Sequence, residues 1–112
     1  MATRALIGMK MDDGIDSVYL HHDGYPEGAG KTLKESYAQP MEVVQLINLG
    51  DLSELKDSTA ECVAFGRDRG ETDVAAIEHA DLTSFLIRAK SLGCQYGYVY
   101  DLATRRWDTW NV

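Results

Sequence analysis

The chain has 112 residues, of which 45% are hydrophobic and 26% are charged, and its formal net charge at pH 7 is −7. This length and composition are typical of one globular domain with a single hydrophobic core, so we expect residues 1–112 to form one domain. The acidic charge argues against binding duplex nucleic acid through a broad basic face. No apolar run approaches the roughly 20 residues of a membrane-spanning helix, so no membrane partner is expected.

The N-terminal segment MATRALIGMK lacks the apolar core of a secretory signal. Cys62 and Cys94 do not have the spacing of a paired CxxC motif, and we expect two free, buried, reduced thiols. These observations predict a cytoplasmic protein.

Alternating apolar residues predict a strand over 3–11 and a second strand over 15–22. Between them, Asp12, Asp13 and Gly14 predict a hairpin turn, because glycine accepts the positive φ of tight turns. Leu6 interrupts the alternation of the first strand.

The middle of the chain favours short helices. A helix is expected from about Gly28, and a second one over 41–49, where Val43, Val44 and Ile47 have helical spacing. Gly50 is expected to end that helix in the left-handed conformation. Residues 51–55 predict a further helical turn.

The second half of the chain begins with a short predicted strand over 62–65 and a charged loop over 66–73, while 74–79 fits either an extended segment or a helix. Asp81 is expected to cap a helix over 82–92 that stops at Gly93.

The chain ends in a predicted hairpin, with strands over 95–101 and 105–110 joined across 102–104. Together the elements predict an α+β domain. Its sheet is expected to be mainly antiparallel, built from two terminal hairpins plus a short strand, with about three helices on one face.

The turn after the second strand carries the densest polar chemistry of the chain, with His21, His22, Asp23 and Tyr25 next to one another. We interpret it as one half of a binding site. A metal site is not favoured, because neighbouring residues on a strand face opposite ways unless the strand has ended, and no third ligand has metal spacing. A catalytic pair is not favoured either, because no serine or cysteine nucleophile stands in a recognisable context.

The segment GAGKT, which contains Lys31 and Thr32, resembles a phosphate-binding loop, but that pattern needs a glycine where Tyr25 stands. A weaker expectation survives, because a glycine-rich helix start presents backbone N–H groups and the positive end of the helix dipole to an anion. The alternative is that the glycines only form the turn and that Lys31 is solvated.

The segment GRDRGE, which contains Arg67, Asp68 and Arg69, is the expected second half of the site. If it is extended, both arginines share one face, and arginine forks suit phosphates and carboxylates. Internal pairing of Arg67 or Arg69 with Asp23, Glu27 or Glu71 is an equally open interpretation.

Tyr96, Tyr98 and Tyr100 alternate along the predicted C-terminal hairpin, which also carries Trp107 and Trp110. Such aromatic residues either stack on a base, fill the core or anchor an interface between subunits. A homodimer is therefore among the expected partners.

Four segments of the chain resemble a family of small proteins encoded by tailed bacteriophages and prophages. They are Thr3-Arg4-Ala5, the turn HDGYPE, the segment GKTL and the loop GRDRGE. The resemblance extends over nearly the full length, although His22 stands where that family typically has tryptophan. It implies an accessory protein of a bacteriophage that acts in the cytoplasm of the host bacterium, and by analogy one that counters a host defence.

Two hypotheses follow for the function. In the first, Arg4, His21 or His22, Lys31, Arg67 and Arg69 converge on a phosphate-bearing, nucleotide-type ligand while Tyr25 stacks on its base. The protein then sequesters the ligand without turnover, and no cofactor or metal is expected. In the second, the acidic surface docks on a host enzyme and inhibits it. The position of the arginines distinguishes the two hypotheses.

Overall fold

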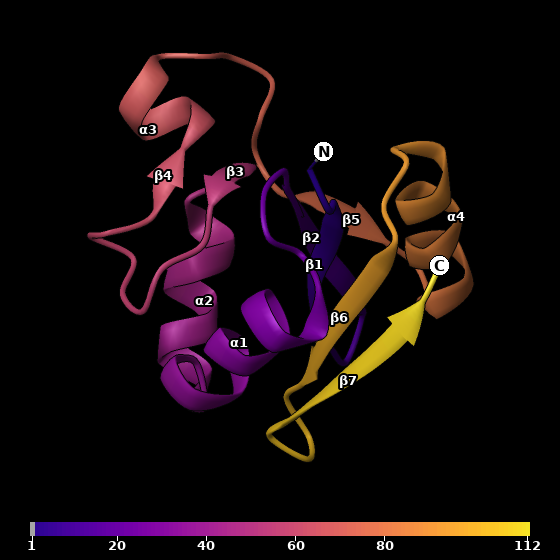
Figure 1. Cartoon of the computed structure of the whole chain (residues 1–112). Coiled ribbons are helices and arrows are strands. Elements are labelled where there is room, and N and C mark those ends of the chain that lie inside the picture. The colour runs from indigo at the N-terminus through magenta and orange to yellow at the C-terminus, as the bar shows by residue number, and fades with distance from the viewer. Residues whose placement is uncertain (1) are drawn as a thin grey trace.

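A mixed seven-stranded sheet forms the centre of the computed structural model, which describes residues 2–112 (Figure 1). In chain order the strands are β1 Ala5–Met11, β2 Gly14–Leu20, β3 Leu52–Glu54, β4 Val63–Ala64, β5 Ile77–His79, β6 Tyr96–Asp101 and β7 Arg106–Asn111. Their spatial order is β4-β3-β2-β1-β6-β7, and β5 also pairs with β2. The α+β class and the mainly antiparallel sheet are confirmed, although β1 runs parallel to β6 and β2 parallel to β3.

Both predicted hairpins are present, β1 with β2 and β6 with β7. The first closes at Gly14, whose φ of +149° and close approach to the carbonyl oxygen of His79 exclude a side chain. The alternation of apolar and polar residues and the turn residues between the strands were therefore sufficient to predict both hairpins.

The helical segments are the π-helical turn η1 Pro26–Gly30, and the α-helices α1 Lys31–Ser36, α2 Pro40–Asn48, α3 Phe65–Arg69 and α4 Leu82–Ser91. Asp81 caps α4 as predicted, because its Oδ1 accepts a hydrogen bond of 2.9 Å from the amide of Ser84. Gly50 and Gly93 follow α2 and α4 with φ near +77°, which confirms both expected helix ends.

The helices cover both faces of the sheet, so the expectation that they share one face is wrong. On one face, Leu33 of α1 and Leu46 of α2 pack against the buried side chains of β1, β2 and β6. On the other face, Phe85 of α4 packs against Leu6 and Ile15. The interruption of the alternation at Leu6 was the sequence signal for this second layer, because a strand that is buried on both faces has apolar residues on both.

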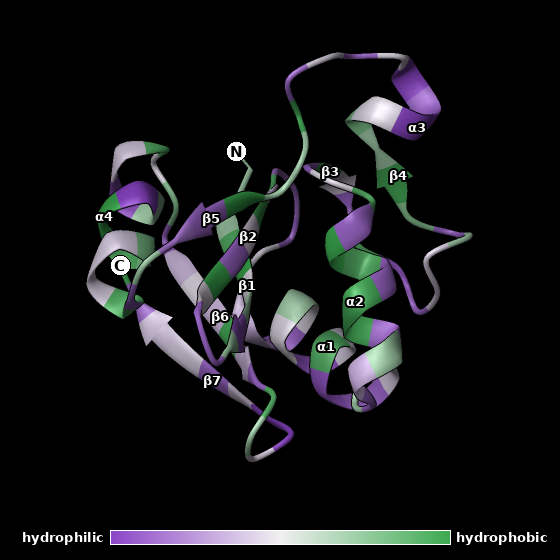
Figure 2. Ribbon diagram, turned by 180° about the vertical axis from the view of Figure 1, so that it is seen from behind, coloured by the Kyte–Doolittle hydropathy of each residue, from purple (hydrophilic) through white to green (hydrophobic). Residues whose placement is uncertain are grey.

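Two local predictions are also wrong. The segment 51–55 contains strand β3 and not a helical turn, because the amides of His21 and His22 donate to the carbonyls of Leu52 and Ser53 at 3.0 and 3.1 Å. Residues 66–69 belong to helix α3 and not to a loop. Hydrophilic residues dominate α3, in contrast to the apolar bands of α2 (Figure 2). The ambiguous segment 74–79 contains strand β5, which pairs with β2.

Candidate functional site

The two adjacent histidines lie where β2 has ended, at Leu20. The amides of both histidines donate to carbonyls of β3, and the chain bends at His22. The rings of His21 and His22 meet edge to face, with 4.5 Å between their centroids. The end of the strand thus removes the alternation that would have separated them.

His21 lies among polar and cationic groups. Its Nδ1 is 2.7 Å from the phenol oxygen of Tyr19. Partial burial lowers the pKa of His21, and the nearby His22, Arg4 and Arg69 lower it further. Of these three residues, His22 follows β2, Arg4 directly precedes β1, and Arg69 belongs to α3. We call Arg4, His21, His22 and Arg69 the basic cluster.

Both arginines of the basic cluster keep much of their hydrogen-bonding capacity. Arg4 is exposed, and its Nη1 has a long contact of 3.4 Å with the carbonyl of Leu92. Arg69 is exposed, its Nη2 lies 3.3 Å from Ser53 Oγ, and its guanidinium carbon lies 5.1 Å from the centre of the Phe65 ring. Each guanidinium has five N–H donors, so these contacts orient the side chain and leave donors for an anion.

Arg67 and Asp68, in contrast, serve the fold. Arg67 donates to the carbonyls of Thr59 and Cys62 at 2.8 and 2.6 Å and forms an ion pair of 2.9 Å with Asp68. Asp68 also accepts the amide of Ala64 at 2.8 Å, which fixes the start of α3. The hydrogen bonds to Arg67 and to that amide hold the pKa of Asp68 below its usual range. The structure therefore separates the two arginines of this motif, with Arg69 in the basic cluster and Arg67 in internal contacts.

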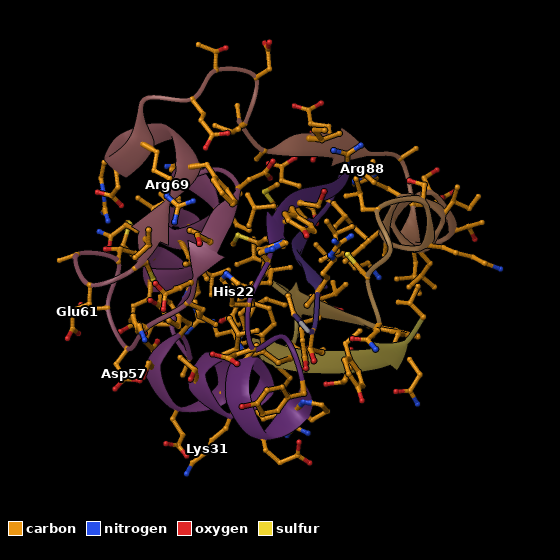
Figure 3. The ribbon with its side chains drawn as sticks, turned by 45° about the horizontal axis from the view of Figure 1, so that its top comes forward. His22, Lys31, Asp57, Glu61, Arg69 and Arg88 are labelled. Atoms are coloured by element: carbon orange, nitrogen blue, oxygen red, sulfur yellow. The ribbon has the colours of Figure 1, made fainter. Side chains whose placement is uncertain are left out.

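The glycine-rich segment does not present a row of free amides. The amides of Gly28 and Ala29 donate to the carbonyls of Tyr25 and Asp23, both at 3.0 Å, and the amide of Lys31 donates to carbonyls of the same turn. The Lys31 side chain is exposed, and in Figure 3 it points outward at the edge of α1, away from His22 and Arg69. Lys31 is therefore not part of the basic cluster.

A cavity of about 300 Å³ adjoins the basic cluster and shares His22 with it. We call it the acidic cavity. Residues from the turn and α1 line one side, and residues from the loop after β3 line the other; among them are His22, Asp23, Tyr25, Thr32, Asp57 and Glu61. The sequence thus pointed to four of these residues, and the structure brings them together.

The shape of the acidic cavity depends on the backbone of the turn. Asp23 has a φ of +57°, which is uncommon for a residue with a side chain. A Cβ on Gly28 would lie 2.7 Å from the Asp23 carbonyl oxygen and 3.1 Å from the Tyr25 ring. The missing side chain therefore lets the Tyr25 ring, which remains 39% exposed, lie close to the turn.

The loop side of the acidic cavity presents the carboxylates of Asp57 and Glu61 beside the ammonium group of Lys56. Asp57 accepts a hydrogen bond of 3.3 Å from Ser36, and Glu61 accepts one of 2.9 Å from Ser58, each through one carboxylate oxygen. The other oxygens can accept from amino groups of a ligand. The site therefore combines cations for an anionic group with acceptors and an aromatic ring for a neutral, polar group.

Sequence reasoning missed Tyr19, Asp57 and Glu61. The sequence could have indicated Tyr19, because residues two apart on a strand share one face and Tyr19 precedes His21 by two positions. No sequence pattern could have indicated Asp57 and Glu61, because their place beside the turn depends on the pairing of β3 with β2.

The cysteines, the possible metal ligands and the lengths of the helices complete the description. Both cysteines are free and buried, as predicted, and burial raises the pKa of the Cys94 thiol to about 11. Among residues 2–112, no group of three or more His, Cys, Asp or Glu side chains is arranged to hold a metal ion. No helix in the same part of the chain has the length and apolar character to cross a membrane.

Comparison with known proteins gives no relative. No protein-family model matches the chain, and neither the curated proteins nor the solved structures contain a significant match.

Proposed function

We propose that this protein binds a phosphate-bearing, nucleotide-type ligand and sequesters it without turnover. The observation that carries the proposal is the basic cluster, in a chain of net charge −7. In it the rings of His21 and His22 meet edge to face, and the exposed Arg4 and Arg69 lie near enough to lower the pKa of His21. The acidic cavity beside it offers Tyr25 as a stacking surface for a base. Binding without turnover is supported by the thiols, which are buried and, in the case of Cys94, hard to ionise.

The biological setting is part of the same proposal. The turn HDGYPE and the loop GRDRGE resemble segments of small bacteriophage proteins, and on that ground the protein is a phage accessory protein in the host cytoplasm that counters a defence. Capture of a nucleotide signal fits a protein whose two thiols are both buried. A homodimer is the expected state.

The proposal is tested by a thermal-shift panel of nucleotides, cyclic dinucleotides and ADP-ribose derivatives. A ligand at 100 times its dissociation constant adds about 2.7 kcal/mol to the unfolding free energy, which corresponds to several degrees for a domain of this size. We expect one class of phosphate-bearing compound to raise the melting temperature and to be recovered chemically unchanged after incubation. A cleaved product contradicts sequestration, and the absence of any shift contradicts ligand binding.

A pH titration adds a prediction that is specific for His21. Its pKa is lowered in the free protein, so the ring is neutral at pH 7, whereas a bound phosphate favours the protonated ring. Binding of a phosphodiester ligand is therefore expected to take up a proton and to tighten as pH falls from 7 to 6, by at most about tenfold per pH unit for one proton. A phosphodiester is the suitable probe because it has no titration of its own in this range.

His21→Gln is the matched variant for this titration. It is expected to bind at pH 7 but to lose the increase of affinity at lower pH. Calorimetry measures the affinity at each pH. If the affinity of the wild type stays constant or falls towards pH 6, the phosphate does not bind beside His21.

A second function is favoured by the acidic surface. Asp23, Asp57 and Glu61 border one opening, and such a group of carboxylates also suits a basic surface of a host enzyme. If the panel gives no shift, inhibition of a host defence enzyme becomes the better proposal. Affinity purification from host lysate with wild type and with Asp57→Asn/Glu61→Gln then tests it.

A further inference from the structure

Strand β7 is an uncovered edge of the sheet. All six of its residues, Arg106–Asn111, pair with β6, and within residues 2–112 no strand pairs with its other side. Figure 1 shows β7 at the outer margin of the sheet. The opposite margin is different, because β4 has two residues and its pairing with β3 has an irregular register. Natural proteins usually protect long edges with proline, bulges or shortened strands, and the regular pairing of β7 has none of these.

The direction of the free backbone groups follows from one hydrogen bond. The amide of Val112 donates to the carbonyl of Gln95 at 3.0 Å, so the backbone of Val112 faces β6. In an antiparallel ladder this direction alternates from residue to residue. The outward N–H and C=O groups of β7 therefore belong to Trp107, Thr109 and Asn111, which are symmetric about Thr109.

We propose that two copies of this chain pair through β7 in antiparallel orientation, with the two-fold axis at Thr109. In this register Thr109 lies opposite the partner's Thr109, and Trp107 lies opposite the partner's Asn111. Every outward backbone group of β7 then has a partner, and the two sheets become one continuous sheet. Opposed threonines are also a favourable cross-strand pair. The symmetric arrangement of these groups is the reason for choosing a second copy as the occupant of the edge.

Neighbouring registers are less favourable. An axis at Asp108 would place two aspartates directly opposite each other, and like charges in opposed positions are destabilising. It would also leave Asn111 with no residue of the partner's β7 opposite it. With the axis at Thr109, Asp108 faces the partner's Trp110 and Arg106 faces the partner's Val112, so no two like charges lie opposite each other.

An apolar hollow beside β7 supports the same interface. Leu86, Ile87 and Val112 line it at the end of the strand, and Ile87 is 65% exposed. Because Val112 lies opposite the partner's Arg106, the partner strand runs beside this hollow and reduces its exposure. The interface is independent of the basic cluster, so it can hold whether or not the protein binds a nucleotide.

Cysteine cross-linking tests the axis directly. Thr109→Cys places two thiols opposite each other at the axis, at a backbone separation that a disulfide can bridge. Thr104→Cys is the matched control, because Thr104 is an exposed residue of the hairpin turn and lies far from the axis. The native cysteines are buried and do not compete. Under mild oxidation we expect a disulfide-linked dimer with Thr109→Cys only, detected by intact mass.

Sedimentation analysis completes the test. The wild type is expected to have twice the chain mass of 12.4 kDa. Thr109→Pro removes an outward amide without removing a hydrogen bond to β6, so this variant is expected to stay folded by circular dichroism and to become monomeric. A monomeric wild type, a folded Thr109→Pro variant that remains dimeric, or equal cross-linking of both cysteine variants would overturn the proposal.

Discussion

Gly50→Ala is expected to lower the free energy of unfolding by about 3 kcal/mol or more. Gly50 has a φ of +77°, which is costly for a residue with a side chain, and a Cβ at this position would collide with the carbonyl oxygen of Val74. That carbonyl cannot easily retreat, because it accepts a hydrogen bond of 2.8 Å from the amide of Asp51. Urea unfolding of the purified variant measures the loss.

Gly70→Ala is the matched control for this substitution. Gly70 has a similar φ of +68°, but a Cβ there has no atom within 4 Å. Only the backbone penalty remains, and the lower entropy of the unfolded alanine chain offsets part of it, so the expected cost is about 1 kcal/mol. Equal losses for the two variants would show that crowding at Val74 has no energetic consequence.

The effect of Gly50→Ala is expected to extend to the candidate site. Asp51 follows Gly50 directly, and its Oδ1 accepts the amide of Tyr19 at 2.9 Å. Burial raises the pKa of this carboxyl, and the hydrogen bond from Tyr19 opposes that shift. Displacement of Asp51 therefore disturbs the strand that carries Tyr19 and His21.

Arg4→Gln/Arg69→Gln is expected to weaken binding of the nucleotide that gives the largest thermal shift by about 100-fold. Hydrogen bonds to charged groups contribute about 1.5–3 kcal/mol each, so the loss of two arginines corresponds to about 3 kcal/mol at the lower limit. Both side chains are exposed, and their contacts with the rest of the fold are few, so the double variant is expected to remain folded. Titration calorimetry measures the affinity.

Lys31→Gln is the control for charge. It also removes a positive charge, but Lys31 is exposed and points away from the basic cluster, so its affinity is expected to stay within about twofold of wild type. If Lys31→Gln weakens binding as strongly as the double variant, the ligand is held by long-range attraction or at the start of α1, and the basic cluster is not its site.

The candidate site shows which kinds of residue could be predicted. The sequence pointed to His21, His22, Asp23 and Tyr25 because polar and aromatic side chains are crowded into one turn, and the structure places them at the basic cluster and the acidic cavity. It also pointed to Arg67 and Arg69 as a pair. The structure divides them, because residues 66–69 form a helical turn and Arg67 meets the carbonyls of a neighbouring loop.

Local patterns by themselves determined the two hairpins, the capped helix α4 and the glycine at the end of α2. In each case the signal is the side-chain period, a capping carboxylate or a positive φ, which act between residues that are close in the chain. Tertiary structure alone decided the strand β3 and the placement of Arg4 and Arg69 near His21. These features depend on contacts between distant segments, where the burial of apolar side chains and the satisfaction of backbone hydrogen bonds outweigh weak local preferences.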